Sequence, residues 1–364
     1  MKYIIAGDSH GPTMACILTG FPSGLNFDLN FIKNDLHLRS SVFGRSSRMK
    51  LENDEPTFLS GIYNGMTTGA PITFTVDNKS KGFNKEIRSI PRPGHGDYSA
   101  YAKYKINDFN IYAERNSARW TVILTILGSL SRQVLNFFGI DIIGYVCKVG
   151  SVTLDETFSY SPNLRNRRNN SELLCPDEIL TKKMIEEIKI VEKNGNTIGG
   201  KVKIVSTKIP AGLGSYAETR SKLDTKISSI LFSIPSVKGV IFGDEIYDGK
   251  EYADTFIKED LSISRDSNHC GGIEAGFSNG MPLHITLFVK PIPTMRDGAK
   301  SIDFNTKEYA KSPYIRSDIT SVPAVSVISE AAISFVILDT ILEKYGNGNI
   351  RDIKNRIAND EFNW

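Results

Sequence analysis

The sequence predicts an α+β fold in which antiparallel β-sheets pack with long buried helices. Three observations indicate it. Strand-like and helix-like segments interleave without the regular strand–helix–strand period of a doubly wound sheet. Apolar side chains alternate with other residues at 283–289, the pattern of a half-buried strand. Two long apolar stretches, at 120–138 and 322–342, contain charges that a membrane span would disfavour, so we expect core helices.

The first half of the chain begins with a strand at Lys2–Ala6, followed by the glycine-rich turn GDSHGP. At 59–76, a β-branched run punctuated by glycine predicts strands joined by tight turns. The helix at 120–138 ends at Gly139, a favourable residue just past a helix end. A further strand is expected at 140–152.

The second half contains two polar segments. Residues 154–176 include the cluster LRNRRNN and predict an exposed loop or insertion, and residues 346–364 predict a polar C-terminal tail. The elements expected between them are an amphipathic helix at 177–194, a strand at 201–209, a helix at 222–232 and a strand at 238–242. A chain of 364 residues is one large domain or two ordinary ones.

The charge balance and the cysteines exclude several classes of protein. Forty-four Lys and Arg residues against 41 Asp and Glu leave a net charge of +3, too even for a protein that coats nucleic acid. The four cysteines form no CxxC pair, which excludes a disulfide scaffold and a conventional zinc site. The N-terminus lacks the apolar run of a signal peptide, so we expect a cytoplasmic protein without a membrane partner.

Three of the five histidines lie in short glycine-containing turns: His10 in GDSHGP, His95 in RPGHGDY and His269 in SNHCGG. Such turns expose a side chain at the end of an element, where proton transfer can occur. The chain has no HxH or HExxH spacing, which favours acid–base chemistry over metal binding. His37, in a predicted helix, and His284, on a predicted strand, are expected to be structural.

Basic residues cluster in a loop rich in glycine and serine, which holds Arg39, Arg45, Arg48 and Lys50. Arginine presents a planar fork that matches carboxylate and phosphate oxygens. Further along the chain, five basic residues each lie within two positions of Ser, Thr, Pro or Gly: Arg115, Arg119, Lys290, Arg296 and Arg316. Together these residues predict a site for a small substrate with several negative charges. Nucleic acid is the alternative, but few aromatic residues interleave with the cluster.

Ten segments occur in the order found in one enzyme family. They are MKYIIAGDSHGP, GRSSRMKLE, LSGIYNGMTTGAPITF, RPGHGDY, NSAR, PAGLG, VKGV, SNHCGGIEAGFSNGMP, KPIPT and RSDITSVPA. Over essentially its whole length the chain therefore resembles the chorismate synthase family. The resemblance implies a single domain over 1–364 with the family's β-α-β sandwich, assembled as a homotetramer.

The resemblance also implies an activity. Enzymes of this family convert 5-enolpyruvylshikimate 3-phosphate to chorismate and phosphate by a net 1,4-anti elimination. They require reduced FMN although no net oxidation or reduction occurs, and some members use NADPH. The substrate's two carboxylates and one phosphate match the arginine-rich site inferred above. The implied partner is this small molecule, with no nucleic acid and no metal.

Individual roles follow from the same resemblance. His10 would protonate the departing phosphate, His95 would lie near N1 of the reduced flavin, and Asp318 would assist removal of the C6 proton at flavin N5. The substrate anions would be held by Arg39, Arg45, Arg48, Arg119 and Arg316, of which some members use the first two for NADPH. Flavin contacts would come from Arg115, Asn116, Ser117, Pro235, Ser236, Ala275, Lys290, Pro291, Ile292, Pro293, Thr294 and Arg316.

One segment departs from the family pattern. Where the family reads GGGRSSARET, residues 112–121 read YAERNSARWT, so that Tyr112, Ala113 and Glu114 replace three glycines. We expect the added bulk, and the charge of Glu114, to weaken FMN binding. The favoured interpretation is an active enzyme. The alternatives are a paralogue that keeps the anion site without flavin catalysis, and a nucleotide- or RNA-binding protein that uses the 39–50 loop.

Overall fold

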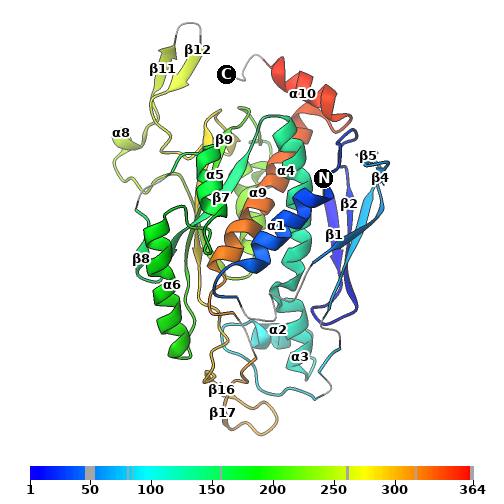
Figure 1. Ribbon diagram of the computed structural model, residues 1–364, viewed down its shortest axis with the longest axis vertical. Helices are drawn as coiled ribbons and strands as arrows, with labels where there is room; N and C mark the ends of the chain where they lie inside the picture. The colour runs from blue at the N-terminus through cyan, green and yellow to red at the C-terminus, as the bar shows by residue number, and fades with distance from the viewer. Residues whose placement is uncertain are drawn as a thin grey trace.

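Two antiparallel sheets enclose a layer of helices (Figure 1). The structure is a computed structural model, and it describes residues 1–45, 54–79, 82–84, 86–155, 158–259, 262–315 and 318–360. The first sheet has the order β1 (Lys2–Ala6), β2 (Thr13–Thr19), β6 (Ile72–Asp77) and β3 (Pro56–Ser60). The second has the order β10 (Val237–Phe242), β15 (Pro282–Val289), β9 (Gly200–Lys208), β7 (Ile142–Val149) and β8 (Val152–Thr153). The predicted α+β fold with antiparallel sheets is confirmed.

The remaining strands pair as short hairpins. These are β4 (Ile62–Tyr63) with β5 (Met66–Thr67), β11 (Phe256–Glu259) with β12 (Ser262–Arg265), β13 (Ile273–Glu274) with β14 (Phe277–Ser278), and β16 (Lys300–Ile302) with β17 (Tyr309–Lys311). At the lower end of Figure 1, the hairpin β16–β17 lies near α2 (Asp97–Tyr104) and α3 (Phe109–Asn116). The short helical segments η2 (Ala118–Trp120), η3 (Thr219–Ser221) and α8 (Gly249–Tyr252) complete the connections.

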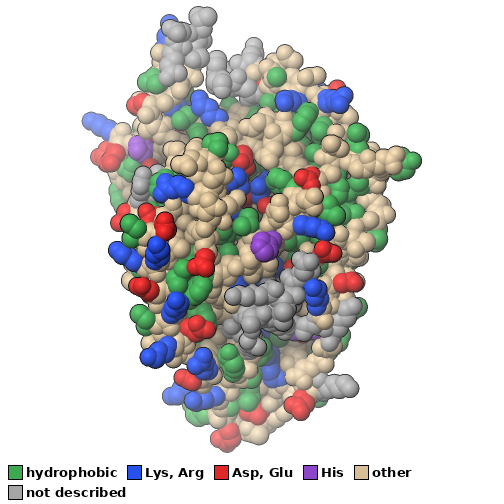
Figure 2. All heavy atoms as spheres, in the orientation of Figure 1, with side chains coloured by type: hydrophobic (Ala, Val, Ile, Leu, Met, Phe, Trp, Pro, Cys, Tyr) green, Lys and Arg blue, Asp and Glu red, His purple; other side chains and the backbone are tan. Residues whose placement is uncertain are grey.

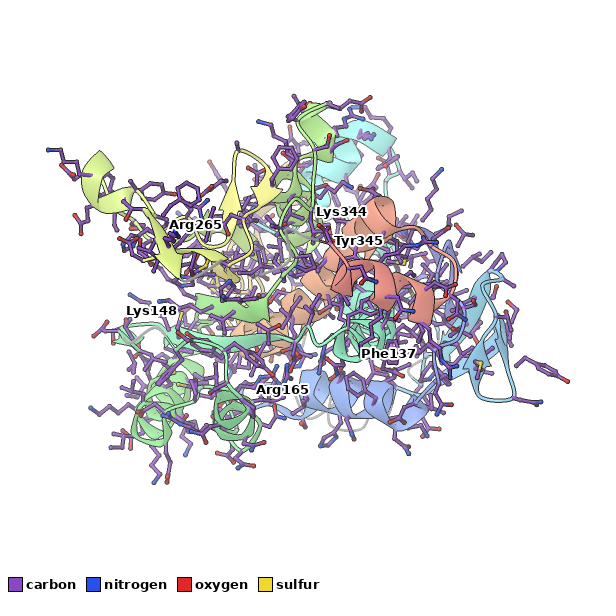
Figure 3. All side chains as sticks on the ribbon, turned by 90° about the horizontal axis from the view of Figure 1, so that it is seen from above. Phe137, Lys148, Arg165, Arg265, Lys344 and Tyr345 are labelled. Carbon is purple, nitrogen blue, oxygen red and sulfur yellow. The ribbon has the colours of Figure 1, made fainter. Side chains whose placement is uncertain are left out.

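The central layer is built around α9 (Val322–Tyr345), which packs against α1 (Leu29–Ser41), α4 (Thr121–Phe137) and α7 (Leu223–Ser233). Seen from above, the helical layer separates the two sheets (Figure 3). On its sheet side α9 contacts β7 and β9, and α4 contacts β2. The strand predicted at 283–289 and the helices predicted at 120–138 and 322–342 are confirmed as β15, α4 and α9.

Two glycines let α9 approach its neighbours closely. A Cβ at Gly128 of α4 would overlap backbone atoms of Ala331, and a Cβ at Gly144 of β7 would overlap the carbonyl oxygen of Ser326. Because backbone atoms cannot rotate aside, only glycine fits at these two crossings. By length and hydropathy α9 would be able to cross a membrane, but 94% of its most apolar window is buried inside the fold. It is a core helix, as predicted.

A buried charge cluster joins α9 to the segment predicted as an exposed loop. Glu330 of α9 is fully buried and pairs with Arg132, Arg165 and Arg168. Burial by itself would raise the pKa of Glu330, but these three guanidinium groups outweigh it and lower the pKa to about 2. Arg165, which Figure 3 labels, and Arg168 both come from α5 (Pro162–Asn169). The segment 154–176, expected to be an exposed polar loop or insertion, thus contains a helix whose Arg165 and Arg168 pair with the buried Glu330.

The other outer elements are α6 (Glu178–Lys193), which packs on β7 and β8, and α10 (Ile350–Ala358), which packs on α9. Ile350 and Ile353 of α10 are buried, so the polar tail contains a packed helix. Figure 2 shows one face of the molecule, on which basic and acidic side chains are interspersed. On the described part of this face no continuous basic band is visible, unlike the surface of a protein that coats nucleic acid.

Candidate active site

A cavity of about 740 Å³ lies where α4 and α9 begin. Its wall comes from segments far apart in the chain: the turn after β1, the end of α1, the RPGHG turn, α3, the α7–β10 connection and the residues that follow β15. Sites for small organic ligands measure roughly 300–1,000 Å³, so the cavity has room for a ligand of this class.

The turn after β1 places His10 at the cavity wall, where α3 holds it. Nδ1 of His10 lies 2.7 Å from Oε1 of Glu114, and the His10 backbone N–H donates to Oε2 of the same carboxylate at 2.7 Å. The hydroxyl groups of Ser9 and Ser117 are 3.0 Å apart. The end of α3 and the residue after it therefore fix the turn that carries His10.

His95 lines the same cavity, and buried charges hold its ring. Its Nδ1 lies 3.2 Å from Oδ1 of Asp97 and 2.9 Å from Nη2 of Arg92. Asp97 is fully buried and also pairs with Arg88. Burial lowers the pKa of His95 by more than the hydrogen bond to Asp97 raises it, which favours the neutral ring at pH 7. With Nδ1 engaged by the protein, Nε2 is the ring nitrogen that a ligand would meet.

The predicted substrate arginines lie in the wall as ion pairs. Arg119 and Arg39 converge on Asp54, with Nη1–Oδ distances of 2.6 and 3.6 Å respectively. Arg45 pairs with Asp318 at 2.6 Å. Since a guanidinium group carries five N–H donors, each arginine can bond a protein carboxylate and ligand oxygens together. Asp54 was not identified from the sequence because it lies in an acidic stretch without a diagnostic spacing.

The starts of α4 and α9 add to the positive character of the cavity. Thr121 of α4 and Ala324 of α9 line it, and neither helix is capped by the side chain of its N-cap residue. A helix N-terminus offers backbone donors and a partial positive charge to an anion. The hydroxyl oxygen of Ser321, the N-cap of α9, is buried in this wall and bonds no other described group.

Most residues expected to contact flavin also line the cavity: Asn116, Ser117, Pro235, Ser236, Lys290, Ile292, Pro293 and Thr294. Arg115, Ala275 and Pro291 are not part of its lining. The side chain of Arg115 is 59% exposed and donates to the Gly7 carbonyl. Arg48 and Arg316, expected to bind substrate or flavin, lie outside the described residues.

Lys290 combines a partly buried position with a cationic neighbour. Burial lowers its pKa, and the nearby charge of Lys238 acts in the same direction. Its ammonium group donates to the Gly94 carbonyl at 2.9 Å. The wall beside it includes the apolar side chains of Ile234 and Pro293. A planar ring system bearing an anion therefore suits this part of the cavity, because an anion would stabilise the two ammonium groups.

The third turn histidine does not join the other two. His269 Nδ1 lies 3.1 Å from Oδ2 of Asp244, and His284 Nδ1 lies 3.6 Å from Oδ1 of the same carboxylate. Neither these two histidines nor His37 of α1 is among the residues that line the cavity. The structure thus brings together His10 and His95 but not His269.

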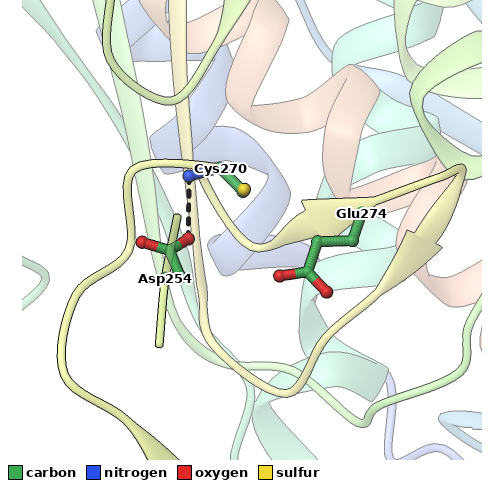
Figure 4. Close-up of side chains that lie close together, drawn as sticks. All are labelled: Asp254, Cys270 and Glu274. Atoms are coloured by element: carbon green, nitrogen blue, oxygen red, sulfur yellow. Dashed lines mark hydrogen bonds between the residues drawn. The ribbon is translucent and has the colours of Figure 1, made fainter. Parts of the chain in front are cut away.

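Asp254, Cys270 and Glu274 form a compact trio that resembles a metal-ligand set (Figure 4). The carboxylate of Asp254 accepts hydrogen bonds from the backbone N–H groups of His269 and Cys270. Glu274 accepts from Arg265, at 2.8 Å. Burial raises the pKa of the Cys270 thiol to about 11. Through these hydrogen bonds the trio holds the turn 266–271 in place.

The chorismate synthase family model matches residues 1–342 of the chain. The chain belongs to the chorismate synthase family. The chorismate synthase of Thermotoga maritima is 48% identical over 363 residues, which cover 100% of this chain and 96% of that protein. The chorismate synthase of Alkaliphilus metalliredigens is 35% identical, with 97% of both chains covered. A solved structure described as a crystal structure of chorismate synthase has a TM-score of 0.81 at 27% identity and covers 98% of this chain and 96% of its own.

The segment that departs from the chorismate synthase pattern is helical here. Tyr112 is 4% exposed, packs on Phe109 and bonds to the backbone of Ile106. It does not line the cavity, whereas Ala113 and Glu114 do. The expectation that Tyr112 adds bulk beside the flavin does not fit this geometry, because the ring is part of the core under α3.

Proposed function

We propose that the protein catalyses the chorismate synthase reaction in the cavity around His10 and His95. One observation carries the proposal. Folding gathers into a single cavity the two turn histidines, the carboxylate of Asp318 and the arginines Arg39, Arg45 and Arg119. A substrate with two carboxylates and a phosphate is complementary to that set of charges.

The cavity arginines would act because their charges are held in fixed positions. Arg39 and Arg119 are held by Asp54, and Arg45 is held by Asp318, so their charges are oriented before substrate arrives. Such fixed groups stabilise charge on the leaving phosphate without having to reorganise during the reaction. Because Arg39 and Arg45 are buried in these ion pairs, we assign them to the substrate rather than to NADPH.

The residues along the second wall fit reduced FMN. Lys290 and Lys238 suit its phosphate, and the apolar side chains of Ile234 and Pro293 suit its ring system. When bound, reduced FMN would supply electron density to the substrate without net redox change. The chain itself would orient the cofactor against the substrate and exclude water from both.

Proton transfer falls to two side chains. Nε2 of His10 would donate a proton to the phosphate oxygen as the bond from C3 breaks. The Asp318 carboxylate, oriented by Arg45, would help to take up the proton lost from C6. The neutral ring of His95 would donate or accept a hydrogen bond at Nε2 and so orient the ligand beside it.

We further propose a cytoplasmic homotetramer. Ile4 and Ile17 are direct partners on β1 and β2, and their side chains are 70% and 46% exposed on the outer face of the first sheet. Exposed apolar side chains side by side on a sheet are a common feature of subunit interfaces. The interface would bury them against a second copy of the chain.

The decisive test is anaerobic incubation with reduced FMN and 5-enolpyruvylshikimate 3-phosphate, with phosphate release and chorismate formation measured together. We expect equal amounts of both products. Binding of the substrate without turnover would favour the flavin-deficient paralogue.

A further inference from the structure

Both carboxylate oxygens of Glu114 contact His10. Oε1 lies 2.7 Å from Nδ1 of His10, and Oε2 accepts the His10 backbone N–H at 2.7 Å. The Glu114 side chain is 14% exposed and that of His10 32% exposed, so the contact lies in the cavity wall, partly shielded from water. A glycine at 114, as in the family pattern, has no side chain with which to make it.

The contact determines which ring nitrogen carries the proton. An ionised carboxylate only accepts hydrogen bonds, so Nδ1 must be the donor. The neutral ring is then the Nδ1–H tautomer, and Nε2 is the nitrogen that exchanges protons with a ligand. When Nε2 is also protonated, the bond from Nδ1 to Glu114 remains. One hydrogen bond therefore serves both states of the ring, and no rotation is needed between them.

We propose that Glu114 is the positioning residue for His10, setting its tautomer and aiming Nε2 into the cavity. This inference rests on the proposed function, in which Nε2 donates the proton that the departing phosphate receives. In that step the carbon–oxygen bond breaks with its electron pair leaving on phosphate, the proton passes from Nε2 to the phosphate oxygen, and His10 is left as the Nδ1–H tautomer.

The turn itself has other supports. Asn78 donates from Nδ2 to the carbonyl oxygens of Asp8 and Gly11, at 3.0 and 2.9 Å. The Ser9 and Ser117 hydroxyls add a further contact. The backbone of the turn is therefore anchored independently of Glu114, and removal of the Glu114 carboxylate should act mainly on the ring of His10.

The test compares Glu114→Ala and Glu114→Gln with the matched control Glu187→Gln. Glu187 also accepts one backbone and one side-chain hydrogen bond, both from Ser151, and is not part of the cavity lining. In ¹⁵N-histidine-labelled protein without ligands, assigned with His10→Gln, we expect the neutral His10 ring to carry its proton on Nδ1 in the parent and the Glu187→Gln protein. In Glu114→Ala the Nε2–H tautomer should become the major form.

In turnover assays, we expect Glu114→Ala to lower kcat by about 10²-fold, the effect of misplacing a reacting group by roughly 1 Å. KM should change little, because the lost interaction acts in the transition state. Glu114→Gln should lie between Glu114→Ala and the parent, since its amide oxygen can still accept the backbone N–H while its NH2 group faces Nδ1, which holds the ring in place but makes Nδ1 the acceptor and Nε2 the protonated nitrogen.

An unchanged His10 tautomer in Glu114→Ala would overturn the proposal, as would parent-like kcat in that variant. If the parent protein releases no phosphate, the proposed reaction fails. The NMR comparison still decides the role of Glu114 in that case, so the two failures are distinguishable.

Discussion

The hydroxyl group of Tyr112 bonds both backbone groups of Ile106. It accepts the Ile106 N–H at 2.7 Å and donates to the Ile106 carbonyl at 2.9 Å. These bonds tie the start of the loop before α3 to the buried side of the helix. Tyr112 thus stabilises α3, the helix that carries Glu114, although Tyr112 itself does not line the cavity.

Replacement of Tyr112 by phenylalanine should therefore affect stability and not cofactor binding. We expect the free energy of unfolding of Tyr112→Phe to fall by about 0.5–1.5 kcal/mol, the net value of such hydrogen bonds. Urea unfolding measures it, with Tyr104→Phe, whose side chain is 61% exposed, as the control. A weaker or tighter affinity for FMN at unchanged stability would place Tyr112 in the cavity wall instead.

Removal of either cavity histidine should slow turnover. We expect His10→Ala to lower kcat by about 10²–10⁴-fold, the range of general acid–base contributions, and His95→Ala to lower it by about 10²-fold, the effect of misplacing a ligand by roughly 1 Å. His37→Gln, on α1 and outside the cavity lining, is the matched control. Steady-state phosphate release measures the effect. Near-normal turnover in either alanine variant removes that histidine from the mechanism.

The buried Glu330 cluster should make stability depend on acid pH. The ordinary pKa of glutamate, 4.5 in the unfolded chain, falls to about 2 for Glu330 in the fold. Its stabilising contribution is thus fully present above pH 4.5 and is lost as the pH falls towards 2. We expect Glu330→Gln to lose about 3–5 kcal/mol at pH 7, because the fully buried Arg168 loses the carboxylate it pairs with, whereas Arg132 and Arg165 keep Asp35 and Asp141.

The control for this substitution is Glu343→Gln, on the same helix with a side chain 54% exposed. Chemical unfolding at pH 7 and pH 3 separates the two variants. A Glu330→Gln protein as stable as the parent at pH 7 would show that the cluster contributes no net stability.

FMN and the enolpyruvyl substrate should bind cooperatively. Arg39 and Arg119 share the single carboxylate of Asp54, and the substrate anions would neutralise the positive charge that remains in this wall. We expect each ligand to tighten the other by roughly 5–150-fold, or about 1–3 kcal/mol, because the coupling is reciprocal. Anaerobic calorimetry of FMN with and without substrate measures it, and equal affinities would remove the coupling.

The exposed pair Ile4 and Ile17 should lie in a subunit interface. Light scattering of the parent protein should give a mass about four times the 40.4 kDa of the chain. Ile17→Lys should lower this mass, because a charge buried at an apolar interface is costly. As a control, Ile190→Lys on α6, where the residue is 62% exposed, should leave the mass unchanged. A parent mass near that of one chain would refute the assembly.

Sequence reasoning predicted best where periodicity or a motif carries local information. The alternation at 283–289 and the apolar runs at 120–138 and 322–342 correspond to β15, α4 and α9. The glycine turns singled out His10, His95 and His269 alike, and of these only His10 and His95 line the cavity. In each case neighbours in the chain determine the structure.

The same reasoning failed where partners are distant in the chain. Arg168 lies in a segment whose composition predicts exposure, yet it is buried because Glu330, more than 160 positions later, requires its charge. The roles of Asp54 and Glu114 likewise depend on Arg119 and His10, which only folding brings near. Local composition cannot distinguish a charged residue that is buried with a partner from a charged residue that is exposed.

The close approaches of α9 to Gly128 and Gly144 make the positions of the cavity residues depend on residues outside the cavity. Ser326 and Ala331, which face Gly144 and Gly128, lie on the same rigid helix as the cavity residue Ala324. An added methyl group at either glycine would push the helix along or away from its neighbours, and its first turn would move with it. A displacement of about 1 Å at a reacting centre can cost roughly 10²-fold in rate. A genetic screen for inactive variants would therefore recover alanine at 128 and 144 alongside the histidine substitutions, although neither glycine contacts a ligand.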